Sequence, residues 1–189
     1  MAVGMIDQAL WVVGRGTGIT ALGLFTLSIA LGIGTRSGRP LVTLPRFAVL
    51  DVHRFAALLG TVFVFIHVGN LLADPYAQLR LIDLTVPFVG AYEPLWLGLG
   101  TLAFDLLLAV MVTSLLRHRL GIRVFRVMHW VTYAVWPIAF AHALGNGTDS
   151  SHGWFLAFAG ICAVTVAAAL TFRLRADFLE YSERRMATR

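Results

Sequence analysis

Five long apolar segments, separated by shorter polar stretches, make up most of the chain. They cover residues 10–33, 49–72, 95–116, 124–144 and 154–172. About 20 apolar residues are enough to cross the roughly 30 Å hydrocarbon core of a bilayer as an α-helix, and strands rarely reach this length. The pattern therefore predicts an all-α integral membrane bundle of five transmembrane helices, built as a single domain over residues 1–189.

The arginines between these segments indicate an orientation. Every basic residue among the 15 is Arg, and 13 of them fall on one side of the predicted membrane: Arg36, Arg39, Arg46, Arg54, Arg117, Arg119, Arg123, Arg126, Arg173, Arg175, Arg184, Arg185 and Arg189. The other side has Arg15 and Arg80, together with five of the ten acidic residues, Asp7, Asp74, Asp83, Glu93 and Asp149. Cytoplasmic loops carry the excess of positive charge. We therefore expect a multi-pass protein of the bacterial cytoplasmic membrane, with its N-terminus outside and its C-terminus in the cytoplasm.

Composition supports the membrane assignment and excludes several other classes. The chain is 58% hydrophobic and only 13% charged, against roughly 25% charged in a soluble domain. A net charge of +5 suits nucleic acid in principle, but the arginines lie between apolar runs and form no compact basic face, so lipid is the expected partner and nucleic acid is not. The single cysteine, Cys162, excludes a disulfide framework, an iron–sulfur motif and a redox CxxC pair.

Four histidines inside the apolar segments form two matched pairs. His53 and His67 are fourteen positions apart on the second segment, and His129 and His142 are thirteen positions apart on the fourth. Histidine in hydrocarbon is costly unless its ring nitrogens are satisfied, so each one is a candidate functional residue. These two segments run in the same direction in the predicted topology, which places His53 level with His129 near the inner face and His67 level with His142 near the outer face. The two levels would lie roughly 20 Å apart.

Helical phase supports one pair better than the other. An interval of fourteen makes nearly four turns, so His53 and His67 share a face, whereas an interval of thirteen rotates His142 away from His129 on an ideal helix. Pro137 lies between the latter two and can kink the helix. Any one of the four histidines is equally well explained as a buried side chain bonded to a neighbouring helix. Four histidines at two matching levels favour two sites that each hold a haem iron between facing helices.

Beyond spacing, the sequence resembles the transmembrane domain shared by ferric reductases and NADPH oxidases, over roughly residues 11–154. The resemblance is carried by the following matches: Gly14-Arg15-Gly16-Thr17-Gly18, His53-Arg54, Leu59-Gly60, Ile66-His67, Leu97-Gly98-Leu99-Gly100, Thr113-Ser114, Leu120-Gly121, Met128-His129 and Ala141-His142. There is also a likeness to the haem-bearing membrane subunit of the bacterial periplasmic methionine sulfoxide reductase system, around residues 97–129. His53 favours the two-haem pattern of the first family.

The resemblance implies two b-type haems, an inner one held by His53 and His129 and an outer one held by His67 and His142. Arg54 and Arg126 are candidate partners for an inner haem propionate, and Arg15 for an outer one. Each arginine is equally well explained as a topology anchor or a lipid headgroup contact. Iron with two histidine ligands has no open position, so we expect electron transfer, and we assign no catalytic residue.

The leading hypothesis is therefore a di-haem b cytochrome that carries electrons across the membrane as a subunit of a ferric-reductase-like oxidoreductase. Since the chain ends at Arg189, we expect it to lack flavin- and NADPH-binding domains of its own. A flavoprotein reductase or quinol would donate electrons, and a ferric chelate, oxygen or an extracytoplasmic partner protein would accept them. Two alternatives stay open: a quinol-oxidising haem anchor for an extracytoplasmic reductase, and a non-redox helical membrane protein.

Three further features of the sequence are not part of the two predicted haem sites. Asp105 stands in the middle of the third segment, where a charge is costly, and we expect it to have a structural partner. His118 and His152 fall in connections and are interpreted as solvated residues. The connection over residues 74–94 is long and is expected to cover the outer site or to receive an acceptor.

Overall fold

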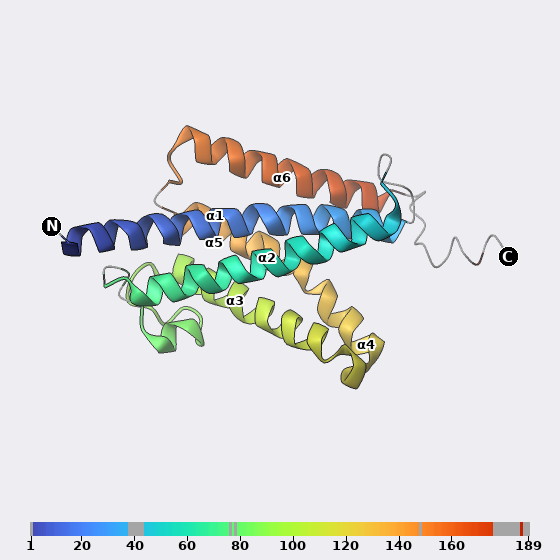
Figure 1. Cartoon of the computed structure of the whole chain (residues 1–189), viewed down its shortest axis with the longest axis horizontal. Helices are drawn as coiled ribbons and strands as arrows, with labels where there is room; N and C mark the ends of the chain where they lie inside the picture. Colours follow the sequence, from blue (N-terminus) through green and yellow to red (C-terminus); the bar gives the residue numbers. More distant parts are fainter. Residues whose placement is uncertain are drawn as a thin grey trace.

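The computed structural model describes residues 2–37, 44–75, 77, 79–147, 149–175 and 186. Its regular elements are all helices: α1 (Ala2–Ser37), α2 (Arg46–Ala73), the 3-10 helix η1 (Leu81–Leu84), α3 (Pro94–Leu115), α4 (Arg117–Trp130), α5 (Thr132–Asn146) and α6 (Gly153–Leu174) (Figure 1). The all-α prediction is confirmed for this part of the chain. Arg39, Arg184, Arg185 and Arg189, which contribute to the orientation prediction, lie outside the described residues.

Four helices are long and apolar enough to cross a membrane. They are Gln8–Ser37 within α1, then α2, α3 and α6. α1, α2 and α6 contain the predicted segments and extend beyond them at both ends, whereas α3 begins one residue before its segment and ends one residue before the end of it. The chain is therefore a multi-pass membrane protein.

The predicted fourth segment, residues 124–144, is divided between two helices. α4 ends at Trp130, α5 begins at Thr132, and α5 alone has 15 residues, about 22 Å of helix. The hydrogen bonds explain the break, since the Thr132 hydroxyl donates to the His129 carbonyl at 2.7 Å, and the Val131 and Ala134 amides both bond three residues back. The count of five spans and the sides on which the termini lie stay predictions.

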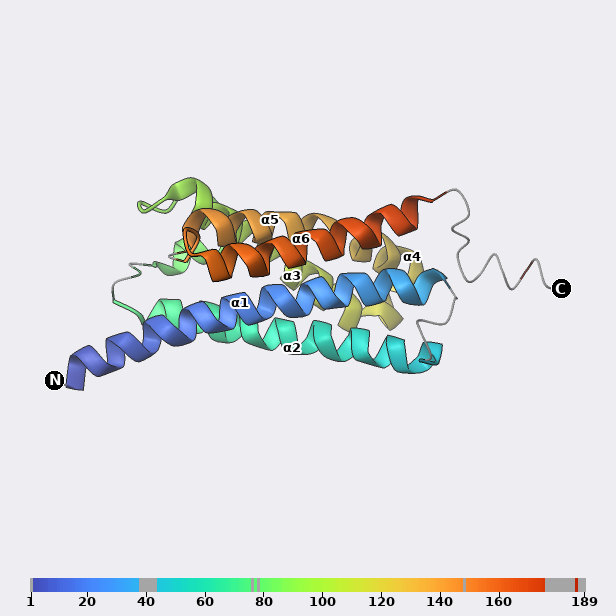
Figure 2. The ribbon, with the colours of Figure 1, turned by 90° about the horizontal axis from the view of Figure 1, so that it is seen from above.

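α1 is the central helix of the bundle. α2 lies antiparallel to it along most of its length, and α5 and α6 also pack on α1, while α3 packs on α5 (Figure 2). α4 forms a hairpin with α3 and projects from one end of the bundle (Figure 1). The molecule thus consists of an α1–α2 pair and an α3–α5 pair that are joined mainly through α1 and α5.

A small core holds α1, α5 and α6 together. Its buried members are Leu22 of α1, Trp136 of α5, and Cys162 and Val166 of α6. The Trp136 indole Nε1 donates to the Thr26 Oγ1 at 2.9 Å, and this buried bond crosses from α5 to α1. The Thr26 hydroxyl in turn donates to the Leu22 carbonyl at 2.8 Å, so both groups are satisfied.

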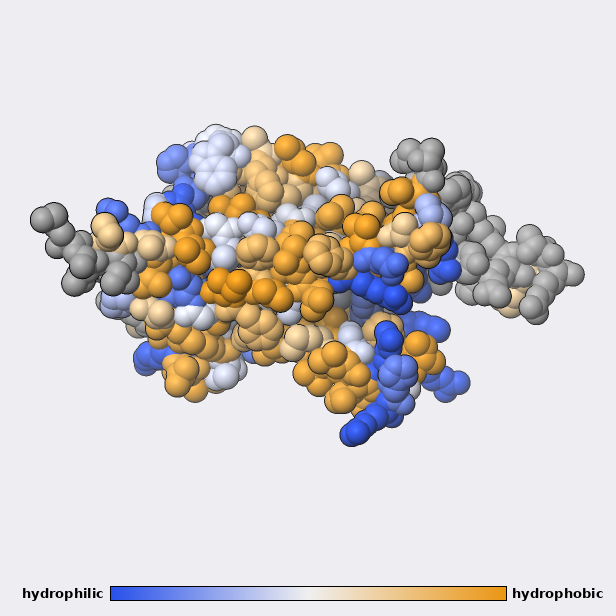
Figure 3. All heavy atoms as spheres, viewed as in Figure 1, coloured by the Kyte–Doolittle hydropathy of each residue, from blue (hydrophilic) through white to orange (hydrophobic). Residues whose placement is uncertain are grey.

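The outer surface is apolar around the middle and charged at one end. Hydrophobic side chains cover most of the central part of the face in Figure 3, and hydrophilic ones gather at the end formed by α4. Large exposed apolar residues occur on every long helix, for example Phe55, Val112 and Ile161. This is the surface expected of helices in contact with lipid.

We expect Thr26→Val to destabilise the bundle by roughly 1–3 kcal/mol, because the buried Trp136 N–H would lose its acceptor. Thermal unfolding in detergent, monitored by circular dichroism, measures the change. Thr20→Val is the matched control, since Thr20 lies on the same helix, also bonds four residues back, and is exposed. Equal unfolding temperatures for the two variants would contradict the prediction.

Candidate cofactor site

A cavity of about 900 Å³ runs along the bundle between the α1–α2 pair and the α3–α5 pair. Its walls come from α1, α2, α3, α4 and α5, and are mostly apolar. Pockets for drug-sized ligands and cofactors usually measure about 300–1,000 Å³, so this one is large. All four candidate histidines line it, as do Arg15, Arg54 and Arg126. The structure thus brings every predicted site residue to one cavity.

The histidines meet across the cavity in the predicted combinations. At one level the ring centroids of His53 and His129 are 6.2 Å apart, with the rings nearly perpendicular at 81°. At the other level, His67 of α2 and His142 of α5 both line the cavity. Each level therefore pairs one imidazole from α2 with one from the α4–α5 segment.

The break at Val131 removes the phase problem of the second pair. His129 belongs to the last turn of α4 and His142 to α5, so the rotation expected along one ideal helix does not apply. Pro137 lies inside α5, which continues through it. The regular α-helical hydrogen bonding is therefore interrupted at Val131, six residues before Pro137, where the Val131 and Ala134 amides bond three residues back.

Three of the histidines are anchored through Nδ1 to a backbone carbonyl on a neighbouring helix. His67 bonds the Gly14 oxygen at 2.7 Å, His53 bonds the Ser28 oxygen at 2.8 Å, and His142 bonds the Trp96 oxygen at 2.8 Å. A carbonyl only accepts, so Nδ1 carries the proton and a neutral ring keeps its lone pair on Nε2. This is the arrangement typical of histidines that bind metals, in which the second nitrogen is fixed by a hydrogen bond.

A glycine lies one helical turn after each of these carbonyls. The pairs are Gly14 with Gly18, Ser28 with Gly32, and Trp96 with Gly100. A Cβ at residue 18 would lie 3.1 Å from the His67 ring, one at residue 32 would lie 3.1 Å from the His53 ring, and one at residue 100 would lie 2.6 Å from the His142 ring. The absent side chain lets each imidazole lie against the helix and reach a carbonyl that the helix also uses.

The spacing of these acceptors on α1 equals the spacing of the histidines on α2. Gly14 and Ser28 are separated by the same interval as His53 and His67, and Gly18 and Gly32 repeat it. Because α1 and α2 are antiparallel, Gly14 faces His67 and Ser28 faces His53. The register of the helix pair is therefore fixed at two levels by the same contact.

His129 differs from the other three. Its Nδ1 is buried and has no hydrogen-bond partner among the described residues. Its ring stacks on Phe125, one turn earlier on α4, with centroids 5.4 Å apart and an interplanar angle of 28°. The ring is thus held by apolar contacts and by the edge of His53.

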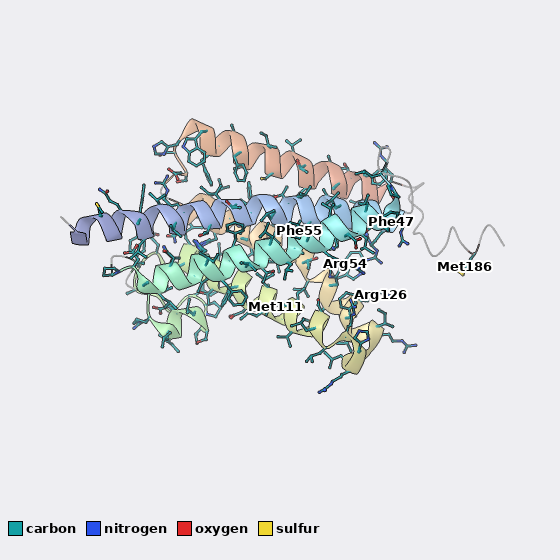
Figure 4. The ribbon with its side chains drawn as sticks, in the orientation of Figure 1. Phe47, Arg54, Phe55, Met111, Arg126 and Met186 are labelled. Carbon is teal, nitrogen blue, oxygen red and sulfur yellow. The ribbon has the colours of Figure 1, made fainter. Side chains whose placement is uncertain are left out.

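The three candidate arginines occupy different environments. Arg15 pairs with the buried carboxylate of Asp149 and lies over the Trp11 ring, 3.8 Å from its centroid. Arg54 is 3.5 Å from Asp51, and both of these side chains are largely exposed. Figure 4 shows Arg54 on α2 and Arg126 on α4 at the same end of the bundle. Arg15 is therefore fixed by protein groups, whereas Arg54 and Arg126 keep more freedom to meet a ligand.

The long connection after α2 contributes to the cavity. Leu79 and Leu84 line it at the end that holds His67. The connection is tied to the bundle by the Thr101 hydroxyl, which donates to the Asp83 carbonyl at 2.6 Å. The Arg80 guanidinium and backbone N–H both donate to the Asp83 carboxylate, and these bonds hold the pKa of that buried carboxyl below its usual range. The prediction that this segment covers one end of the site agrees with its position.

The glycines and their carbonyl partners are the site residues that sequence reasoning missed. The sequence did contain a signal for them: Gly18 and Gly32 are separated by the same interval as the two histidines of the second segment.

Asp105 differs from its prediction. We expected its carboxyl to have a structural partner, but no ion pair or hydrogen bond to it is found in the described part of the chain. His118 is exposed as predicted, while His152 lies 3.6 Å from Asp149.

The donor set suits a flat cofactor bound between two imidazoles. Within the described residues, no three His, Cys, Asp or Glu side chains come together to hold a metal ion by themselves. Each level instead offers two imidazoles on opposite walls of a mostly apolar cavity, which is the environment of a haem with two axial histidines. The residues present therefore fit such a group at both levels.

Comparison with known proteins agrees with this description. The model of the family described as ferric reductase like transmembrane component matches residues 17–140, which is more than half of the chain. The matched range contains His53, His67 and His129, and it ends just before His142. No curated protein and no solved structure matches the chain.

We expect Gly18→Ala to destabilise the bundle, since the new Cβ would lie 3.1 Å from the His67 ring and disrupt its bond to the Gly14 carbonyl. Loss of a buried bond costs roughly 1–3 kcal/mol, which outweighs the roughly 0.5–1 kcal/mol that alanine usually gains over glycine in a helix. Thermal unfolding measures the balance. Gly16→Ala is the control, because a Cβ there has open space around it. A Gly18→Ala variant as stable as the control would contradict the prediction.

The Asp83 carboxylate predicts a pH dependence of the connection. Because the folded pKa is lowered, the stabilisation is complete above the usual carboxyl pKa of about 3.9 and is lost as the pH falls through the lowered value. The hydrogen-exchange protection factors of residues 81–86, which are corrected for the intrinsic pH dependence of exchange, should therefore be high at neutral pH and fall below about pH 4. Asp83→Asn should exchange fast at neutral pH already, whereas exposed Asp51→Asn should match the wild type. Acid-independent protection in the wild type would refute this role.

Proposed function

The chain belongs to the family of ferric reductase-like transmembrane components, and we propose that it is a di-haem b-type cytochrome. It carries electrons across the bacterial cytoplasmic membrane as a subunit of a ferric-reductase-like oxidoreductase. The observation that carries the proposal is the pairing of four imidazoles at two levels of one cavity, with three of them anchored through Nδ1. A buried histidine with a purely structural role would not require the same kind of anchor, beside a glycine one turn away, at three positions on two helices.

His53 and His129 would hold one haem, and His67 and His142 the other. A haem iron with two imidazole ligands supplies one-electron transfer and leaves no coordination position for a substrate. The function of the protein is then to hold the two groups at the two ends of the bundle, which the histidine spacing on α2 separates by roughly 20 Å.

The surrounding residues would tune these sites in three ways. The carbonyls of Gly14, Ser28 and Trp96 fix the tautomer and the orientation of the rings, and they make the ligands more basic. The apolar walls exclude water and lower the local dielectric. The arginines supply positive charge, which suits the propionates: Arg54 and Arg126 at the level of His53, and Arg15 at the level of His67.

The partners follow from the two ends of the cavity. At the arginine-rich end, which the charge distribution assigns to the cytoplasm, a flavoprotein reductase or quinol would donate electrons. At the opposite end, the connection that carries Leu79 and Leu84 would face the acceptor, which is a ferric chelate, oxygen or a partner protein. A cytochrome of this kind only passes electrons on, so the proposal requires one partner that supplies electrons and another that accepts them.

The proposal predicts two haems per chain in protein purified without loss of cofactor. Pyridine haemochrome quantification and reduced-minus-oxidised spectra should show one haem lost or altered in His53→Ala, and the other in His67→Ala. His118→Ala should match the wild type, because this exposed residue lies away from the cavity. Absence of haem from the wild type would overturn the proposal in favour of a non-redox bundle. One haem that is unaffected by His53→Ala would replace it with a single-haem subunit.

A further inference from the structure

The unanchored histidine points to a missing contact. His129 Nδ1 is buried without a partner among the described residues, although the corresponding atoms of His53, His67 and His142 all bond a carbonyl. Buried ring nitrogens of this kind are normally satisfied, and an unpaired one calls for an explanation. The helix to search for a partner is α3, which already anchors His142.

On α1, a carbonyl that anchors a histidine is followed four residues later by a glycine, and we compare α3 with this pattern. On α1 the second anchor follows the first by fourteen positions, which is nearly four turns, so both lie on one face. On α3 the first anchor is Trp96 with Gly100, and the same interval leads to Val110 with Ser114. Gly100, Val110 and Ser114 all line the cavity. Ser114 thus occupies the position on α3 that a glycine occupies in the other three anchors, and His129 is the one histidine that lacks an anchor.

The local hydrogen bonds give this serine a different role from glycine. The Ser114 hydroxyl donates to the Val110 carbonyl at 2.6 Å, and the Thr113 hydroxyl donates to the same oxygen at 3.0 Å. These bonds occupy the carbonyl that a histidine would otherwise reach. The Ser114 Oγ uses its proton in this bond and keeps its lone pairs, so it is able to accept an N–H.

We propose that Ser114 is a positioning residue, whose Oγ accepts the hydrogen bond from His129 Nδ1 when the site holds its cofactor. This inference rests on the proposed function. The serine would do on α3 what the carbonyls of Ser28, Gly14 and Trp96 do for the other three rings.

The structure allows the approach that the bond requires. His129 stands at the end of α4, a helix whose side chains are largely exposed and which carries Gly121 at φ +82° in its first half. A tight turn at Val131 separates it from α5. The regular helix of α4 is thus interrupted at Gly121, and the turns after it, which carry His129, are free to adjust against α3.

The bond has a consequence for the site at the His53 level alone. An imidazole that donates from Nδ1 is a stronger ligand and stabilises the oxidised iron. Ser114→Ala should therefore weaken haem binding at this level about 10- to 100-fold and raise the reduction potential of that haem, with the other haem unchanged. Loss of haem to an acceptor protein and potentiometric titration of the full chain measure the two effects separately.

Two further variants make the test specific. Ser114→Gly should bind haem nearly as the wild type does, because it recreates the glycine gap of the other three anchors and opens the Val110 carbonyl to His129. Thr113→Ala is the matched control: it removes a hydroxyl bonded to the same carbonyl from a residue that does not line the cavity. An unchanged haem at the His67 level in each variant shows that the fold is intact.

The outcomes separate this inference from the proposed function. Two haems in the wild type, with the His53-level haem of Ser114→Ala equal to that of Thr113→Ala in affinity and potential, would overturn the role of Ser114 and leave the cytochrome proposal in place. A wild type without haem would overturn both. Selective weakening in Ser114→Ala, with recovery in Ser114→Gly, is the result that supports the inference.

Discussion

A single repeated contact holds the helices in place, the hydrogen bond from a histidine Nδ1 to a helix carbonyl across a glycine. It occurs between α2 and α1 at His67 and His53, and between α5 and α3 at His142. Each contact needs two helices to approach closely at one point, and a Cβ at the glycine there would lie 2.6 to 3.1 Å from the ring, closer than side chains normally approach. The same contact that satisfies a polar group in an apolar interior therefore also fixes the register of the helix pair.

This contact explains why the cavity has its shape. α2 packs on α1 and α3 packs on α5, so the histidine anchors lie within each pair, and the space between the pairs stays open along the bundle. The core of Leu22, Trp136, Cys162 and Val166 joins the two pairs on the side away from α2. The bundle is thus closely packed where the rings are anchored and hollow where they face each other, which is the arrangement that a buried flat cofactor requires.

The two levels of the site are similar but not equivalent. At the His67 level both rings are anchored, the connection with Asp83 covers the end of the cavity, and Arg15 is neutralised by Asp149. At the His53 level only one ring is anchored, and the nearby arginines Arg54 and Arg126 are more exposed. The second level is the more adaptable one, and it lies at the arginine-rich end, where we propose that an electron donor docks.

Hydropathy and residue spacing were enough to predict the membrane class, the helical content, the position of four of the five apolar segments and the four histidines, because these are local properties of the chain. The predicted pairing of His53 with His129 agrees with the contact between their rings. The break of the fourth segment at Val131 became visible only in the folded chain, where a threonine hydroxyl competes for a carbonyl. The same holds for the glycines at positions 18, 32 and 100 that receive the rings, because these contacts join residues far apart in the chain, whose meeting depends on how the helices pack.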